Sequence, residues 1–390
     1  MNAIRHKSQR VSYLSYILKP FLDIFVSMKI LHLSSEKSWR GGEQQMAYLI
    51  EQLKLLGVES HVAARSNSAF EKWCLANNIP FLSIPYNNVF DISSALKLKS
   101  YCSKNSFDFI HMHSSRSHGL ALLANALGNS VPLILSRRVD FPIKANFFSK
   151  RKYNHALIKN IICVSNKIKD IVSESISNPE KCVTVYDGVD LNRFHGKGMR
   201  GKIRKELGIS DEFKLIGNIA AIAPHKDYFT FLDTVKILSS KIKAKYLIAG
   251  EGPLRKEIEN RIVELELQND VFVLGFRKDV ENVFADLDLL LYTSKEEGLG
   301  STLLDAMAYG LPIVAAEGGG IPEIVKSEFN GLTAPVQDSQ KLSEHVVRML
   351  SDNALREKLV LNAKEFVKDF SKEAMAKQTL AIYKQVLAHK

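Results

Sequence analysis

Short apolar runs alternate with amphipathic stretches along most of the chain. In the first half, the strand-like runs after residue 27 are KILHLSS, ESHVAA, FDFIHMH, VPLILS, IICVS and CVTVY, and helix-like segments separate most of them. After the polar stretch HGKGMRGK (195–202) the alternation resumes with KLIGNIA, AKYLIAG, DVFVLG, DLLLYTS and PIVAA. Nearly continuous apolar strands that alternate with helices are typical of parallel sheets covered on both faces. The pattern therefore predicts an α/β protein with two such sheets.

The length of 390 residues also favours two domains, because single cores rarely grow that large. We predict a first Rossmann-like domain at 28–195, a second at 203–371, and a final helix at 372–390 that packs back on the first domain. The two domains face each other across a cleft. Ligands of open parallel sheets bind at the carboxyl ends of the strands, so the loops that follow strands are the candidate sites.

Residues 1–27 stand apart from this pattern. The stretch 11–28 is apolar and aromatic, but Lys19, Pro20 and Asp23 interrupt it, so it lacks the roughly 18 clean residues of a spanning helix. It also lacks the small-residue cleavage site of a signal peptide. Two interpretations remain: an interfacial amphipathic segment, or an upstream mis-start or disordered tail, because MKILHLSS at Met28 looks like a natural start.

The net charge of +11 lies entirely in the front half of the chain. Residues 1–194 carry 25 Lys and Arg against 14 Asp and Glu, whereas residues 195–390 carry 28 of each. This asymmetry suggests an anionic partner that touches only one domain. No signature of a nucleic-acid-binding motif accompanies the charge. An anionic membrane surface or a lipid-linked acidic acceptor fits better, and solvated lysines without a partner are the plainer alternative.

The cysteines indicate a reducing compartment. Four cysteines are scattered along the chain without a CxxC pair, which is typical of reduced, mostly buried thiols in a cytosolic protein. Their positions are Cys74, Cys102, Cys163 and Cys182.

The stretch EEGLGSTLLDAMAYG (296–310) carries the clearest chemistry. DLLLYTS is a strand, Glu297 to Gly300 form its exit loop, and a helix follows. Glycines let backbone N–H groups approach an anion, and a helix N-terminus adds unpaired donors and a positive dipole end. This arrangement predicts a diphosphate site, with Asp305 placed to accept bonds from a ribose diol. The spacing Thr302-x-x-Asp305 equally fits a capping box, so both interpretations stay open.

Two patterns that resemble metal sites have simpler explanations. DLDLLL (286–291) leads straight into a buried strand, so Asp286 and Asp288 are expected to be helix-end and strand-start acids. HMH (111–113) places two histidines on one face of a strand, but His111 is expected to be structural. We therefore expect neither a metal nor another cofactor.

Taken together, the ordered motifs resemble the retaining glycosyltransferases of family 4, which have the GT-B fold. Glu297, seven residues, an acid, a helix ending AMAYGLPIVA and then GGGIPEIV are similar to the E-x7-E region of that family. Other matching pieces follow the same order along nearly the whole chain after residue 27. They are RGGEQQMA (40–47), DFIHMHSS (108–115), YDGVDLNRF (186–194), APHKD (223–227) and AGEGPLR (249–255).

The resemblance implies a role for individual residues. Glu297 would contact the hydroxyls of the transferred sugar, Lys226 would reach into an open cleft and neutralise the diphosphate, and His113 would sit near the reacting carbon. Asp305 would hold the ribose. The remaining donor-binding positions that the resemblance implies are Gly41, Gly42, Gly250, Gly252, Phe276, Arg277, Gly298, Leu299, Gly300 and Ser301.

Two departures from the family pattern stand out. Asp305 occupies a position where the family usually has Glu, so ribose contact needs a helix shifted inward or a bridging water. Ala221 stands where the family usually has a phosphate-binding Arg, five residues before Lys226. Candidate replacements for that cation are Arg255, Arg277 and His225.

In the first domain, HSSRSHG (113–119) and LSRRVDFP (135–142) follow two strands, so both loops should face the cleft. Arg116, Arg137 and Arg138 are candidates to bind acidic groups of an acceptor. The alternative for each is an ion pair with Asp140 or another carboxylate.

These features predict a retaining, metal-independent transferase. It would move a sugar from a nucleotide-sugar, bound by the second domain, to a lipid-linked or surface-polysaccharide acceptor, such as lipopolysaccharide or capsule, bound by the first. We expect a cytoplasmic protein associated peripherally with the inner face of the membrane. The alternatives are a nucleotide-sugar epimerase of the same fold, which would need acid/base carboxylates deep in the cleft, and a non-catalytic nucleotide-binding module.

Overall fold

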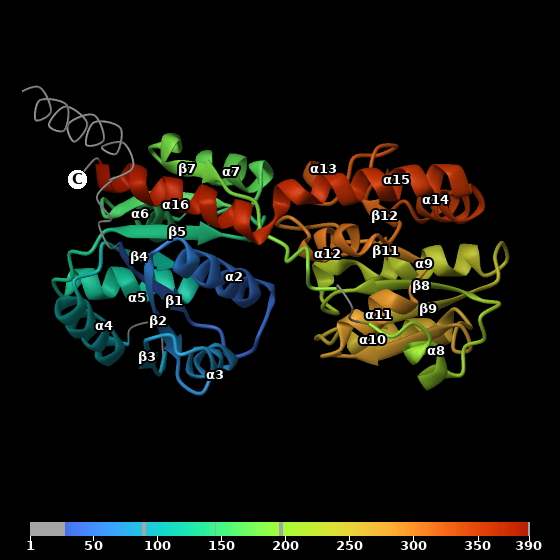
Figure 1. Ribbon diagram of the computed structural model, residues 1–390, viewed down its shortest axis with the longest axis horizontal. Coiled ribbons are helices and arrows are strands. Elements are labelled where there is room, and N and C mark those ends of the chain that lie inside the picture. The colour runs from blue at the N-terminus through green and yellow to red at the C-terminus, as the bar shows by residue number, and fades with distance from the viewer. Residues whose placement is uncertain (1–27, 88–90, 145, 195–197, 389–390) are drawn as a thin grey trace, which may run out of the picture.

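A computed structural model describes residues 28–87, 91–144, 146–194 and 198–388. The interpretations offered for residues 1–27 therefore lie outside the described residues. The chain forms two α/β domains that lie end to end (Figure 1). Within the described residues, no helix combines the length and the apolar composition needed to cross a bilayer.

The first domain is built on a seven-stranded sheet in which every strand pair is parallel. In spatial order its strands are β3 (Phe81–Ile84), β2 (Glu59–Arg65), β1 (Lys29–Ser34), β4 (Phe109–Met112), β5 (Leu133–Arg137), β6 (Ile158–Cys163) and β7 (Cys182–Thr184). Its helices are α2 (Gly41–Leu55), α3 (Ala69–Ala76), α4 (Ile92–Asn105), α5 (Ser115–Ala126), α6 (Phe147–Tyr153) and α7 (Asn166–Ser173).

The second domain repeats this plan with a six-stranded, all-parallel sheet. Its strands, in spatial order, are β10 (Val271–Gly275), β9 (Ala244–Ala249), β8 (Lys214–Ile219), β11 (Leu289–Tyr292), β12 (Ile313–Ala316) and β13 (Leu332–Ala334). Its helices are α8 (Lys202–Leu207), α9 (Tyr228–Leu238), α10 (Arg255–Glu264), α11 (Val280–Asp286), α12 (Ser301–Tyr309), α13 (Ile321–Ile324), α14 (Ser339–Ser351) and α15 (Asn353–Phe366). The predicted fold class, two Rossmann-like α/β domains, is confirmed.

The apolar pattern missed two strands, and both are short edge strands. β3 has four residues and lies between Pro80 and Pro85, while β13 has only three residues. An edge strand pairs on one side only, so it needs neither the length nor the continuous apolar run that marks an interior strand.

The chain passes between the domains twice, and the two passages touch. Val189 N–H donates to Phe370 O at 2.8 Å, and Lys372 N–H donates to Val189 O at 2.9 Å. The last helix, α16 (Lys372–Ala388), then lies along α2 of the first domain (Figure 1). Tyr383 is completely buried there, in a cluster with residues of β1 and α2.

Candidate active site

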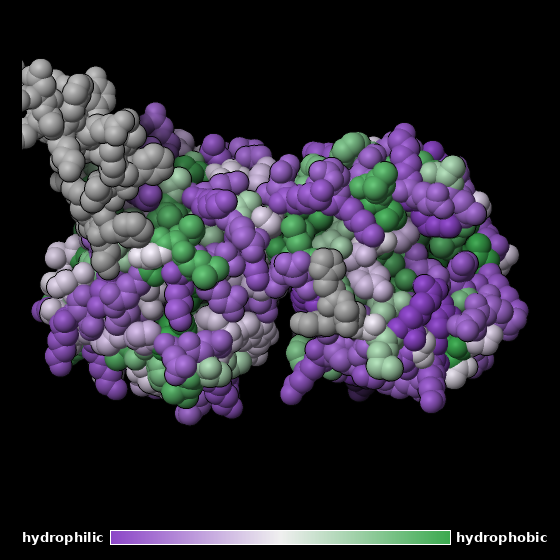
Figure 2. Space-filling view, in the orientation of Figure 1, coloured by the Kyte–Doolittle hydropathy of each residue, from purple (hydrophilic) through white to green (hydrophobic). Residues whose placement is uncertain are grey.

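A cavity of about 1070 Å³ lies between the two domains, and residues of both domains line it. Figure 2 shows the domains as two lobes with a groove between them. The first domain contributes the start of α2, including Arg40 and Gly41, and the second contributes the loops after β8, β9 and β10 and the start of α12. These loops leave the carboxyl ends of parallel strands, where open α/β sheets bind ligands. A volume of this size is sufficient for a nucleotide-sugar.

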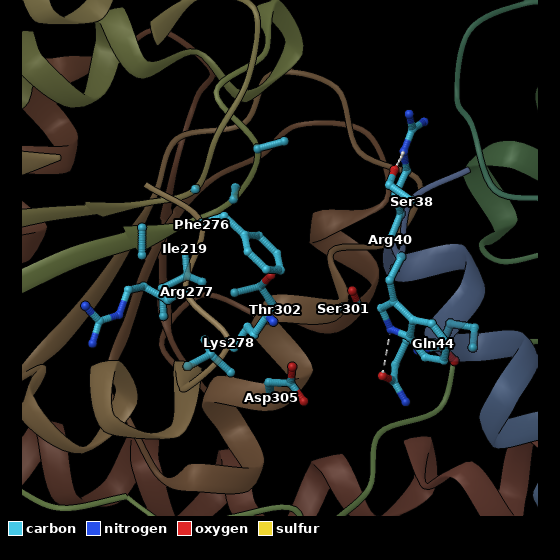
Figure 3. A pocket seen from close by; sticks show the side chains of 18 of the residues that line it. Ser38, Arg40, Gln44, Ile219, Phe276, Arg277, Lys278, Ser301, Thr302 and Asp305 are labelled. Carbon is cyan, nitrogen blue, oxygen red and sulfur yellow. Dashed lines mark hydrogen bonds between the residues drawn. The ribbon is translucent and has the colours of Figure 1, made fainter. Parts of the chain in front are cut away.

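Two helix N-termini meet at this cavity. Helix α2 begins at Gly41 and α12 begins at Ser301, and neither N-cap residue, Arg40 or Gly300, makes a side-chain capping bond. A Cβ atom on Gly41 would lie only 3.8 Å from the Ser301 hydroxyl oxygen. Figure 3 shows Ser301 between Thr302 and the α2 side of the cavity. Unpaired N–H groups and two positive dipole ends therefore converge where an anion can be held.

Asp305 does not cap α12, so the capping-box interpretation is wrong. The N-cap is Gly300, with a left-handed backbone (φ 96°), and no side chain accepts a bond from the first turn. Asp305 instead lines the cavity and accepts a hydrogen bond from Arg193 at 2.9 Å. Arg193 Nε also lies 3.7 Å from Glu281 Oε1. Burial raises the pKa of the Asp305 carboxyl to about 6, with Arg193 opposing the shift.

Lys226, Tyr292 and Glu297 form one buried polar cluster. Lys226 Nζ pairs with Glu297 Oε1, and the Tyr292 hydroxyl lies 3.1 Å from Lys226 Nζ and 2.6 Å from Glu297 Oε1. The Lys226 side chain is only 13% exposed, so the expectation that it reaches into an open cleft is wrong. Burial acts to lower the pKa of Lys226, but Tyr292 and Glu297 raise it above its usual value. The ammonium is therefore charged at any physiological pH.

Glycines let the loop that carries Glu297 press against the first domain. A Cβ on Gly298 would lie 2.3 Å from Arg138 O, and one on Gly319 would lie 2.9 Å from an Asp140 carboxylate oxygen. A Cβ on Gly320 would lie 3.2 Å from that of Ser165. Only residues without a side chain fit at these points. The loop that runs from Glu297 to α12 is thus fixed by contacts with both domains.

The other predicted donor-binding residues lie in or beside the cavity. Gly250, Phe276 and Arg277 line the cavity, with Phe276 67% exposed. Gly252 packs under the loop after β8, where its Cβ would lie 2.2 Å from Ile222 O. Gly42, Leu299 and Gly300 lie beside the cavity without lining it. A Cβ atom on Gly42 would lie 3.8 Å from Arg138 Cδ, and Leu299 is buried.

His113 lies in a row of three histidines and not in the cavity. His113 Nε2 and His32 Nδ1 are 3.1 Å apart, while His111 bonds Tyr383 OH at 2.6 Å and Ser136 Oγ at 2.8 Å. Burial, followed by the neighbouring histidines, lowers the pKa of His113 well below its usual value, so the ring is neutral. One nitrogen from each of the three histidines lies within 4.8 Å of the other two. His111 is hydrogen-bonded through both of its ring nitrogens, whereas His32 Nε2 and His113 Nδ1 have no hydrogen-bond partner among the described residues.

The structure separates the three candidate acceptor arginines. Arg138 is half-buried and pairs with Asp187, as the ion-pair alternative supposed. Arg137 is buried and donates to the Tyr153 hydroxyl at 2.6 Å and to Phe141 O. Arg116 at the start of α5 is exposed, and it makes no ion pair within the described part of the chain.

None of the proposed replacements for the missing cation at Ala221 has a free charge. Arg255 pairs with Glu251 and Glu259, and Arg277 pairs with Glu206 and Asp279. Burial lowers the pKa of His225, so that ring is mostly neutral. The cavity is also lined by Arg40 and Lys278, which are both exposed.

Asp286 and Asp288 serve the fold, as their positions in the sequence predict. Asp286 accepts backbone bonds at the start of α8, from Gly201, Ile203 and Arg204. Asp288 accepts from the Arg204 side chain at 2.9 Å and from Leu215 N–H at 2.8 Å. Both carboxylates therefore stabilise neighbouring backbone, at the start of α8 and of β8.

Sequence reasoning assigned no role to Arg193 or Tyr292, and it treated Asp140 only as a partner for arginines. Arg193 lies in YDGVDLNRF and Tyr292 in DLLLYTS, so both were within quoted motifs. Their partners, Asp305 and the Lys226–Glu297 pair, lie on other elements and could not be read from local spacing. Asp140 faces Glu296 and Glu297, and burial, followed by this like charge, raises the pKa of its carboxyl.

Two α/β domains with parallel sheets and a cavity between them are the architecture of GT-B glycosyltransferases. The family described as "Glycosyltransferase Family 4" matches residues 39–193, and "Glycosyl transferases group 1" matches residues 199–366. A solved structure of an Anabaena protein, HepE, in complex with UDP and glucose is similar, with a TM-score of 0.79. It is 21% identical and covers 93% of this chain and 100% of that one, which shows the fold.

Curated relatives agree with this class. An uncharacterized glycosyltransferase of Methanocaldococcus jannaschii is 27% identical over 93% of this chain and 99% of its own length. The UDP-Gal:α-D-GlcNAc-diphosphoundecaprenol α-1,3-galactosyltransferase of Escherichia coli is 25% identical over 71% of this chain and 75% of its own length. The chain belongs to glycosyltransferase family 4 and is an enzyme.

Proposed function

We propose that this enzyme is a retaining glycosyltransferase that moves a sugar from a nucleotide-sugar to a lipid-linked or cell-surface polysaccharide acceptor. The observation that carries the proposal is the meeting of two uncapped helix N-termini, those of α2 and α12, at one cavity, with Glu297, on the loop that leads into α12, paired with Lys226. Cleavage of a sugar–phosphate bond builds negative charge on the leaving diphosphate. Fixed N–H donors and a lysine stabilise that charge without reorganising.

The roles of the second domain follow from this arrangement. The amides at the start of α12 would hold the distal phosphate, Asp305 the ribose, and Glu297 the hydroxyls of the sugar. Lys226, held in place by Glu297 and Tyr292, would offset the negative charge that develops on the diphosphate. The acceptor would attack from the face that the phosphate leaves, so the sugar keeps its anomeric configuration. The departing phosphate can take the proton of the acceptor, so no protein base is needed. Since cationic groups do the work that a metal does in other transferases, we expect no metal requirement.

The acceptor is inferred from relatives and from charge. The E. coli relative acts on a diphosphoundecaprenol-linked sugar, and a Campylobacter jejuni relative, 23% identical, is also named for a diphospho-undecaprenol substrate. An acceptor of this kind carries a diphosphate and lies in a membrane. The basic first half of the chain matches both features, and it supports a cytoplasmic enzyme that associates peripherally with the inner face of the membrane.

A panel of UDP-, GDP- and ADP-sugars tests the donor site by thermal shift. The matching nucleotide-sugar, at a hundred times its dissociation constant, adds about 2.7 kcal/mol of stability, and the melting temperature should rise by several degrees. Products from that donor, labelled in the sugar, separate transfer from epimerisation, and the same assay with EDTA tests the metal-free expectation. A panel in which nothing shifts the melting temperature would contradict the proposal.

Asp305→Asn should weaken binding of that nucleotide-sugar about tenfold at pH 7.5, because the amide accepts fewer bonds from the ribose diol. Wild-type affinity should fall as the pH drops through about 6, where the Asp305 carboxyl takes up a proton, while the Asn variant stays flat. Asp305→Glu should bind as well as wild type or better. The measurement is isothermal titration calorimetry between pH 5 and 8.

The control is Glu281→Gln, which removes the other carboxylate facing Arg193 without altering the lining of the cavity. It should leave nucleotide affinity within twofold of wild type. If Asp305→Asn binds normally and only melts lower, Asp305 serves the fold through Arg193, and its assignment to the ribose is wrong.

A further inference from the structure

A short segment of the first domain exposes apolar and basic side chains together. In residues 141–153, Phe147 and Phe148 at the start of α6 are 68% and 81% exposed, and Phe141 is 59% exposed. The two neighbouring rings are 5.9 Å apart, edge to face, and contribute little to the core. Isolated exposed apolar residues are common, but adjacent phenylalanines on one short helix indicate a surface with a partner.

The charge of this segment is of one sign. Residues 141–153 contain four basic residues and no Asp or Glu. Lys144, Lys150 and Arg151 are exposed, and none of them makes an ion pair with another described residue. Aromatic rings beside unpaired lysines and arginines match the interface of an anionic bilayer, where rings enter the headgroup boundary and cations meet anionic lipids.

Both ends of the segment are bonded to the rest of the domain. The buried Arg137 guanidinium lies 5.2 Å from the Phe141 ring and 5.6 Å from the Tyr153 ring, and it bonds both residues, so one side chain ties both ends. Lys152 Nζ donates to Ser115 O at 2.8 Å, which fastens α6 to the start of α5. Anchored ends lower the backbone ordering that binding requires.

The position of the segment links it to the active site. The segment directly follows Asp140. A Cβ atom on Gly319 would lie 2.9 Å from a carboxylate oxygen of Asp140, and Gly319 lies against the loop that carries Glu297. A surface held here against a bilayer would keep the mouth of the cleft close to the lipid headgroups. A sugar linked to a membrane lipid could then reach the cleft without leaving the membrane.

We propose that residues 141–144 and 146–153 form a docking segment that seats the first domain on an anionic bilayer, with Phe147 and Phe148 entering the headgroup boundary and Lys144, Lys150 and Arg151 contacting anionic lipids. The proposal deepens the function proposed above, since it rests on an acceptor that lies in the membrane. Its experiment uses no sugar substrate, so the docking segment and the transferase activity can each fail without the other.

The test is co-sedimentation of the full chain with vesicles of phosphatidylcholine and phosphatidylglycerol in 50 mM salt. Phe147→Ser/Phe148→Ser should lower the partition coefficient at least tenfold, and Lys150→Glu/Arg151→Glu should do the same at 50 mM salt but lose its effect at 1 M, where charges are screened. Phe148→Trp should give a blue-shifted emission with these vesicles that wild type lacks. Pure phosphatidylcholine vesicles should bind all variants weakly.

The matched control is Leu55→Ser/Leu75→Ser, which removes two leucines that are 78% and 62% exposed in the same domain. These leucines lie near the carboxyl ends of α2 and α3, on the side of the sheet where the strands begin, whereas the docking segment follows the end of β5. Their substitution should change vesicle binding less than twofold. The proposal is overturned if the double Phe variant sediments like wild type, because another part of the chain is then the anchor. It is also overturned if wild type sediments with neither vesicle, which would point to a protein partner for the exposed rings.

Discussion

Lys226→Ala should lower turnover about a hundredfold or more. The loss of one group that stabilises charge in a transition state typically raises the barrier by about 2.7–4 kcal/mol. Lys226 is held beside the anion site by Tyr292 and Glu297, so its charge is in place before the diphosphate begins to leave. The assay is initial-rate kinetics with the donor that the thermal-shift panel identifies, corrected for the folded fraction of each variant.

This variant should also lose some stability, because it leaves the Glu297 carboxylate buried without its cation. Lys245→Ala is the matched control. Lys245 is 18% exposed, pairs with Asp270 at 2.8 Å and lies 4.7 Å from the Phe213 ring, so it resembles Lys226 in burial and partners, but it begins β9 far from the cavity. It should melt lower without losing turnover. A Lys226→Ala enzyme within threefold of wild type would remove Lys226 from the mechanism.

Gly298→Ala should lower turnover about a hundredfold, because it should displace the loop that carries Glu297 relative to the first domain. The added methyl group would lie 2.3 Å from the carbonyl oxygen of Arg138, which belongs to the other domain, so the loop that carries Glu297 must move away. A displacement of about 1 Å at a reacting group can cost a factor of about a hundred in rate. The melting temperature should change little, because the clash arises between the domains and not inside either core.

Gly119→Ala is the control for this substitution. Gly119 lies inside α5, and a Cβ there would meet nothing within 4 Å. This variant should keep full activity and gain a few tenths to about 1 kcal/mol of stability, since alanine is the better helix former. Equal activity of the Gly298 and Gly119 variants would show that the contact between Gly298 and Arg138 is not needed for catalysis.

The strand pattern was sufficient to predict the architecture. Each interior strand of a parallel sheet is buried on both faces, so its apolar run is visible in sequence whatever surrounds it. The glycine loop before α12 was equally visible, because a tight approach of backbone to an anion has few solutions. The edge strands β3 and β13 were not, since pairing on one side leaves a weak pattern.

Local spacing misled where a distant residue supplied the partner. Thr302 and Asp305 have the spacing of a capping box, but Arg193, 112 residues earlier in the chain, bonds Asp305 instead. The same reason explains the arginines after β4 and β5. Arg116, Arg137 and Arg138 look alike in sequence, yet only Arg116 remains exposed once Asp187, Tyr153 and Phe141 lie in place.

By itself, the sequence determined the fold class, the family and the loops at which a nucleotide-sugar site can form, because those depend on periodicity and on short motifs that each lie within one element. The partner of each charged group could be seen only once the two domains were packed. Lys226 pairs with Glu297, which lies 71 residues later in the chain. Arg137 donates hydrogen bonds to Phe141 and Tyr153, at the two ends of the docking segment. An ion pair, or a hydrogen bond that ties a loop to another element, depends on distances between elements. Those distances are set only when the elements pack together.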